Sequence, residues 1–314
     1  MECGQPENKE PSTKAMKQMK AKQSMKSITC LSVAAVAAFL LPAHAVGAEK
    51  PDGQGKGSYA RVNGLKMYYE IHGTGEPLVL LHGAFATAEG WATVLPTLAK
   101  SRRVIVVELQ GHGRTGDIDR PLSFGQMAED IAVLLKQLQI QRADVFGYSM
   151  GGGVAVALAL KHPDLVRKLA ILGAGTGASK DTYDPESYKQ FKGMTPENFN
   201  FPQVKDPYTR LAPDPTKWPV LVSKIIKMDD DFKGFAEKDV KAIKAQTLVM
   251  MGDHDVVRTE HAAEVARLIP HSQLAIIAGG DHFVLFMSPE KVLAVLMPFL
   301  DAPIQELKKP GDVK

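Results

Sequence analysis

The sequence predicts an α/β fold in which a mostly parallel central sheet is covered by helices on both faces. Short continuous apolar runs such as Pro77–Leu81 and Arg103–Leu109 recur along the chain, and such runs are typical of strands buried on both faces. Segments with helical spacing or alanine-rich composition separate them. Strands that alternate with helices in this way favour a parallel sheet between two helical layers.

The first predicted element is a β-hairpin. Arg61–Ile71 has alternating and β-branched character around Asn63-Gly64, which is a two-residue turn signal. Trp91–Ala99 has helical spacing. Ser123 begins another helix, since Ser123 and Gln126 fit a capping box before an amphipathic segment. The remaining predicted elements are strand 143–147, helix 151–160, strand 169–173, strand 247–252, helix 260–268, strand 273–278 and helix 291–300.

Residues 176–243 interrupt this alternation. Seven prolines lie between Pro185 and Pro219, together with aromatic and methionine residues. Such a long stretch without a function is uncommon in a compact domain, so we expect an inserted, mostly helical lid. Its aromatic side chains either supply an apolar pocket or pack the lid's own core. A long surface loop is the alternative. The fold would then consist of a first core part (58–175), the lid (176–243), a second core part (244–302) and a tail (303–314).

The N-terminal 45 residues have the features of a secretory signal peptide. Recurrent lysines precede an apolar run of about 14 residues, Ile28–Leu41, and the segment ends in Ala43-His44-Ala45, a small-x-small pattern. The run is shorter than the roughly 20 residues that span a bilayer. Cleavage after Ala45 would give a periplasmic or secreted protein without a stable membrane span and with a flexible start at 46–57. An uncleaved anchor is the alternative, and Met25 is an alternative start.

The charge and cysteine content exclude several classes of function for the mature chain. Removing the six lysines and three acids of residues 1–45 from the 38 basic and 35 acidic residues leaves 32 of each. A neutral chain argues against nucleic acid as a partner. Cys3 and Cys30 lie before Ala45, so the mature chain has no disulfide, thiolate nucleophile or cysteine metal site.

The segment Gly147-Tyr148-Ser149-Met150-Gly151 fits the nucleophile elbow G-x-S-x-G, in which a sharp strand-to-helix turn exposes a serine. An apolar strand precedes it and an alanine-rich helix follows, as the motif requires. A serine hydroxyl is a weak nucleophile and needs a general base. Ser149 is therefore the candidate nucleophile. The alternative is that Ser149 is a non-catalytic residue in a glycine-rich turn.

The base and its orienting acid are expected after Ser149 in the order acid, then histidine. His282 follows an apolar strand, at the carboxyl end where open α/β sheets place their sites. Asp255 and Asp253 both follow strand 247–252; we favour Asp255 as the residue that holds the imidazole and expect Asp253 to bond backbone in the turn. The other histidines after Ser149 are expected to be structural or to lie outside the site: His162, His254, His261 and His271.

On these motifs the chain resembles the α/β-hydrolase superfamily over residues 58–302. The resemblance points to Asp255 as the acid. It implies an oxyanion hole formed by the backbone N–H groups of Met150 and Ala84, with Phe85 as the alternative to Ala84. Glu108 stands where relatives often carry Asp, and we draw no catalytic inference from it. The segments that carry the resemblance are His82-Gly83, Gly111-His112-Gly113, Gly147–Gly152, Gly252–Asp255 and Gly279–His282.

The resemblance implies hydrolysis of a carboxylic ester or lactone through an acyl-enzyme on Ser149, with no metal or organic cofactor. A serine nucleophile argues against the epoxide hydrolases and dehalogenases of this fold, which use an aspartate. Similar elbows occur in cofactorless haloperoxidases, enol-lactone hydrolases and macrolide esterases, so a macrolide-type lactone is one candidate substrate. The alternatives are a thioesterase, perhydrolase or acyltransferase with the same triad, and a non-catalytic ligand-binding protein.

Overall fold

The structure, a computed structural model, describes residues 57–304. The predicted signal peptide, residues 46–56 of the predicted flexible segment and residues 305–314 of the tail lie outside the described residues. Within residues 57–304, no helix is both long enough and apolar enough to cross a bilayer.

One sheet of eight strands, in the order β1-β2-β4-β3-β5-β6-β7-β8, organises the described part of the chain. Strands β1 and β2 pair antiparallel, β2 pairs antiparallel with β4, and all other neighbours are parallel. This confirms the predicted mostly parallel sheet. The strands are β1 (Ser58–Val62), β2 (Leu65–His72), β3 (Glu76–Leu81), β4 (Arg102–Val107), β5 (Ala143–Tyr148), β6 (Val166–Leu172), β7 (Gln246–His254) and β8 (Ser272–Asp281).

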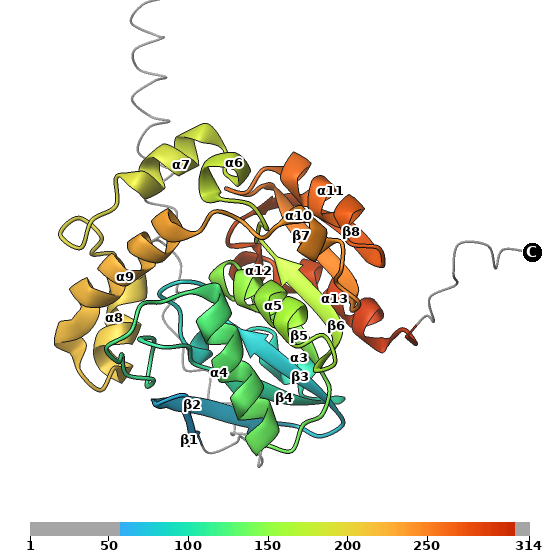
Figure 1. The fold of residues 1–314 in the computed structure, drawn as a ribbon, viewed down its shortest axis with the longest axis horizontal. Helices are drawn as coiled ribbons and strands as arrows, with labels where there is room; N and C mark the ends of the chain where they lie inside the picture. The colour runs from blue at the N-terminus through green and yellow to red at the C-terminus, as the bar shows by residue number, and fades with distance from the viewer. Residues whose placement is uncertain (1–56, 305–314) are drawn as a thin grey trace, which may run out of the picture. The chain divides into compact units, whose positions relative to one another are not determined.

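Both faces of the central strands are buried, as the continuous apolar runs predict. In β3, Leu78 and Leu80 belong to one apolar cluster, whereas Val79 and Leu81 belong to the other. Figure 1 shows α4 and α5 lying across the near face of the sheet. Outside the lid, the helices that share a cluster with this face are α4 (Phe124–Gln137), α5 (Met150–Lys161) and α11 (Thr259–Leu268), and those on the other face are η1 (Ala88–Trp91), α3 (Leu95–Leu98), α12 (Val284–Met287) and α13 (Pro289–Asp301).

Two predicted helices differ in detail from the structure. The helical segment Trp91–Ala99 is divided between η1 and α3, and Pro96 stands in the first turn of α3. Proline has no N–H to donate within a helix, so it fits a helix start rather than a helix interior. At α4, the Ser123 hydroxyl accepts from the Gln126 N–H at 3.1 Å, but the Gln126 side chain bonds Asp130 instead of completing the capping box.

The predicted lid is helical, which confirms a helical insertion, while its exact boundaries stay predictions. Prolines stand in the first turns of three of its α-helices because proline is favoured at helix starts. Helices α8 and α9 pack together in the lid (Figure 1). The lid elements are α6 (Ser179–Thr182), α7 (Pro185–Lys192), α8 (Pro202–Leu211), η2 (Pro215–Lys217), α9 (Trp218–Asp231) and α10 (Glu237–Val240).

Candidate active site

Ser149 stands at the turn between β5 and α5. Its φ of 52° and ψ of −121° lie in a region that non-glycine residues rarely adopt. The turn closes only because the residues two positions before and after Ser149 lack side chains. A Cβ on Gly151 would lie 2.0 Å from the Leu81 carbonyl oxygen, and a Cβ on Gly147 would lie 2.3 Å from the Gly151 carbonyl oxygen. The sequence G-x-S-x-G thus builds the strained elbow that presents the serine hydroxyl.

The His282 imidazole bridges Ser149 and Asp255. Its Nδ1 lies 2.8 Å from Asp255 Oδ1, and its Nε2 lies 3.0 Å from Ser149 Oγ. An ionised carboxylate accepts only, so Nδ1 must carry the proton in the neutral ring. Nε2 is then an acceptor, and the Ser149 hydroxyl donates to it. The ring is therefore in the tautomer that can receive the serine proton.

Asp255 is held rigidly behind this histidine. Its side chain is fully buried, and its Oδ1 also accepts from the Val257 N–H at 3.1 Å. Its Oδ2 is buried with no hydrogen-bond partner among residues 57–304. Burial leaves little water to screen the negative charge, so Asp255 can stabilise an imidazolium strongly.

Asp253 and His254, the neighbouring alternatives, do not reach the site. Asp253 accepts from the Gly280 N–H at 3.1 Å, which is the backbone contact expected of it. The His254 side chain is 76% exposed and faces Asp253 at 4.0 Å. The structure thus brings Asp255, rather than Asp253, to His282.

Burial and charge act in opposite directions on the pKa of His282. Burial alone would lower it, since a buried imidazolium loses its hydration. The charge of Asp255, its hydrogen bond to His282 and the charge of Asp281 together outweigh burial, so the pKa of His282 lies above its ordinary value. The histidine is therefore a stronger base than a free imidazole.

The loop after β3 lies against the elbow, as the predicted oxyanion hole requires. A Cβ on Gly83 would lie 3.2 Å from the Cβ of Ser149. Among residues 57–304 we find no hydrogen-bond acceptor for the backbone N–H groups of Ala84, Phe85 or Met150. All three thus remain candidates to bind an oxyanion, and the choice between Ala84 and Phe85 stays a prediction.

His82 supports this loop directly, and the His112 ring lies beside that of His82 with centroids 4.9 Å apart. His82 donates from Nδ1 to the Gly83 carbonyl at 2.8 Å and accepts at Nε2 from the Leu109 N–H at 3.0 Å. Burial lowers the pKa of His82 to about 4 and that of His112 to about 3. Both rings are therefore neutral near pH 7 and act as structural hydrogen-bonding groups.

Sequence reasoning assigned no role to Tyr148, which the structure places beside His282. Its hydroxyl donates to the His282 carbonyl at 2.8 Å, and its ring centroid lies 5.3 Å from that of the imidazole. In the sequence, its position between Gly147 and Ser149 was the only sign that Tyr148 belongs to the site.

The described residues contain no group of three or more His, Cys, Asp or Glu side chains arranged to hold a metal ion.

A sequence model of the alpha/beta hydrolase fold matches residues 76–243, more than half of the chain. The chain belongs to the α/β-hydrolase family. Its relatives of this family include the 2-hydroxymuconate semialdehyde hydrolase of Pseudomonas sp. (strain CF600), which is 27% identical over 261 residues, with 76% of this chain and 91% of the relative covered. These relatives are hydrolases, and the chain that shares their family is a hydrolase as well.

Solved α/β-hydrolase structures agree with this fold. The meta-cleavage product hydrolase CumD superimposes with a TM-score of 0.67 at 22% identity, over 78% of this chain and 97% of that one. Est816, described as an N-acyl homoserine lactone degrading enzyme, superimposes with a TM-score of 0.62 at 26% identity, over 77% of this chain and 100% of that one.

Proposed function

We propose that the chain is a serine hydrolase that cleaves a carboxylic ester or lactone through an acyl-enzyme on Ser149. The contacts from Asp255 through His282 to Ser149, at 2.8 and 3.0 Å, carry this proposal. A nucleophile, a base in reach of its proton and an acid that fixes the base are the parts that such a reaction needs.

In the proposed reaction, His282 Nε2 takes the Ser149 proton as the serine oxygen attacks the substrate carbonyl. The N–H groups of Met150 and Ala84 stabilise the developing oxyanion. His282 then gives its proton to the leaving alcohol, and the acyl group stays on Ser149. A water molecule, deprotonated by the same histidine, attacks the acyl-enzyme carbonyl; His282 then returns this proton to Ser149 Oγ as the bond between the serine oxygen and the acyl group breaks and the acid is released.

The substrate class rests on the site together with the relatives at 25% identity or more. Est816 is described as acting on a lactone, and CarC, 26% identical to this chain with a TM-score of 0.65, as a serine hydrolase involved in carbazole degradation. Both descriptions are compatible with acyl transfer from a serine to water. A macrolide-type lactone remains a candidate within this class, and a thioesterase, perhydrolase or acyltransferase would use the same three side chains.

Steady-state kinetics test the proposal. The wild type should hydrolyse p-nitrophenyl esters or lactones faster than acyl-CoA, and should not require peroxide. Ser149→Ala should lower kcat by about 10⁶, as removal of a triad serine does in other hydrolases. Activity of Ser149→Ala within about tenfold of the wild type would remove Ser149 from the mechanism.

We also propose export to the periplasm or beyond the cell, with cleavage after Ala45. The support is the basic, apolar and small-x-small order of residues 1–45. Intact mass of the protein from its native host should correspond to a chain that begins at Val46. An unprocessed N-terminus would contradict export by this route.

A further inference from the structure

We propose that Phe85 is a positioning residue through which the lid holds the oxyanion hole in shape. The inference rests on the proposed function and concerns the oxyanion loop, residues 83–89. It assigns a task to the Phe85 side chain, whereas the alternative to Ala84 as oxyanion donor concerned only the Phe85 backbone N–H.

The Phe85 ring is inserted among aromatic side chains of the lid. Phe85 is 7% exposed, although Ala84 and Ala86 on either side are partly exposed. Its ring centroid lies 4.4 Å from that of Phe199 and 5.5 Å from that of Trp218. The Trp218 indole N–H donates to the Phe199 carbonyl at 3.1 Å, which locks the two lid partners together. The loop is thus anchored in an apolar socket formed by Phe199 and Trp218.

This anchor lies next to the predicted oxyanion donor. The Gly83 carbonyl accepts from the His82 ring at 2.8 Å and from the Ala86 N–H at 3.2 Å, which fixes the peptide between Gly83 and Ala84. In a trans peptide the C=O and N–H point in opposite directions, so this also fixes the Ala84 N–H. Phe85 closes the turn with a φ of 62°, a conformation that a bulky side chain rarely adopts. The socket compensates for that strained conformation.

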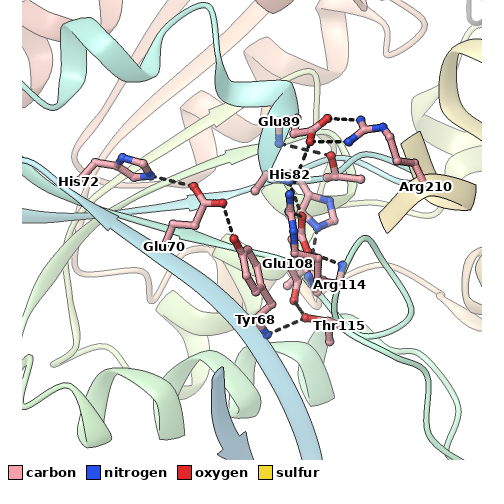
Figure 2. A network of polar contacts seen from close by, with 12 residues as sticks. Tyr68, Glu70, His72, His82, Glu89, Glu108, Arg114, Thr115 and Arg210 are labelled. Carbon is pink, nitrogen blue, oxygen red and sulfur yellow. Dashed lines mark hydrogen bonds and ion pairs between the residues drawn. The ribbon is translucent and has the colours of Figure 1, made fainter. Parts of the chain in front are cut away.

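A second connection from the lid reaches the other end of the loop. Arg210 of α8 forms a bidentate ion pair with Glu89, at 3.0 and 2.6 Å (Figure 2). Arg114 extends this network from Glu89, at 3.5 Å, to the buried Glu108, at 2.8 Å. The Arg210 and Glu89 side chains are 57% and 44% exposed, and exposed ion pairs contribute little. The buried aromatic contact is therefore the stronger link between lid and loop.

The test compares two substitutions of Phe85 with a matched lid control. Phe85→Gly tolerates the positive φ but removes the ring, and Phe85→Leu keeps part of the apolar contact. Phe232→Leu is the control, since Phe232 packs against Phe124 and Phe235. The measurements are kcat and KM for an ester, the rate of labelling by a fluorophosphonate, and thermal unfolding as a check of folding.

If Phe85 positions the donor, Phe85→Gly should lower kcat and the labelling rate by up to about 10², the effect of losing one oxyanion donor, with KM within about threefold. Phe85→Leu should fall between Phe85→Gly and the wild type, and Phe232→Leu should match the wild type. Phe199→Leu changes the lid partner of Phe85 and leaves the loop sequence unchanged. It should also lower kcat, and it replaces the Phe85 variants in the test if these do not fold.

Wild-type kcat and labelling in folded Phe85→Gly, or in Phe199→Leu if Phe85→Gly does not fold, would overturn the inference and leave the proposed function standing. Absence of labelling in the wild type would instead contradict the proposed function. A rise in KM with unchanged kcat would also overturn the inference, because it would show that the ring binds substrate rather than positions the donor.

Discussion

Asp253 and Asp255 show how two carboxylates in one turn acquire different tasks. Asp255 is buried and bonds the imidazole, whereas Asp253 lies in the turn and caps the Gly280 N–H. A buried carboxylate next to a histidine fixes its tautomer and favours its protonated form. A carboxylate that bonds backbone at the surface does neither.

Asp255→Asn should therefore lower kcat by about 10⁴, because an asparagine can hold the ring in the wrong tautomer and carries no charge. Asp253→Asn is the matched control, with kcat expected within about tenfold of the wild type. Ester hydrolysis by the two purified variants decides between the carboxylates. A larger loss in Asp253→Asn would exchange their roles.

The pKa of His282 gives a separate prediction on pH. The base must be neutral, and its pKa lies above the ordinary value of about 6.5, so kcat/KM should fall on the acid side of a pKa above 6.5. Removing the Asp255 charge should move this acid limb to lower pH in Asp255→Asn. A kcat/KM profile that is flat through this range, or that shifts upward in the variant, would exclude His282 as the base.

Among the strands and helices, local patterns predicted most of the fold. The central strands could be predicted because both of their faces are buried and most of their residues are apolar, as in Leu78–Leu81. The elbow could be predicted because its glycines are needed where backbone segments approach closely, and they therefore mark the motif in the sequence. The break between η1 and α3 was missed because the helical spacing of Trp91–Ala99 continues across it.

Contacts between distant segments could not be predicted in the same way. The Phe85 ring meets Phe199 across more than a hundred residues, and neither local sequence indicates the other. Tyr148 bonds the His282 carbonyl across a similar separation. Such pairs depend on how the lid packs on the core, which periodicity does not encode. The choice of Asp255 over Asp253 could be made from the order of residues after the strand, and the family resemblance supported it.

The cap of α4 provides a prediction on stability. The Ser123 hydroxyl satisfies the Gln126 N–H at the start of the helix, and loss of such a cap typically costs about 1 kcal/mol. Ser123→Ala should lower the free energy of unfolding in urea by about this amount, with wild-type kcat, because α4 supplies no residue to the site. An unchanged midpoint would show that the cap contributes nothing here.

Across the described chain, the sheet brings the three candidate side chains together. Ser149, Asp255 and His282 follow β5, β7 and β8, whose carboxyl ends meet at one edge because these strands are parallel. Residues 57–304 contain no cysteine, so the two apolar clusters on the faces of the sheet must hold this arrangement. The site therefore depends on the stability of the entire core.

Acid should weaken that core through His82 and His112. Both are neutral in the fold, with pKa values of about 4 and about 3, but would take up protons near pH 6.5 when unfolded. Their contribution to stability is thus complete above pH 6.5 and is lost progressively as pH falls toward 4. The thermal midpoint should decline over this range, and less steeply in His112→Asn. Equal slopes for both proteins would contradict this account.

The most direct test of the central claim is to identify the nucleophile covalently. Mass spectrometry of peptides after fluorophosphonate treatment should find one adduct, on the peptide that contains Ser149, and none in Ser149→Ala. His282→Ala should be labelled far more slowly, because the serine then has no base. An unlabelled wild type, or an adduct at another residue that persists in Ser149→Ala, would contradict the proposed mechanism.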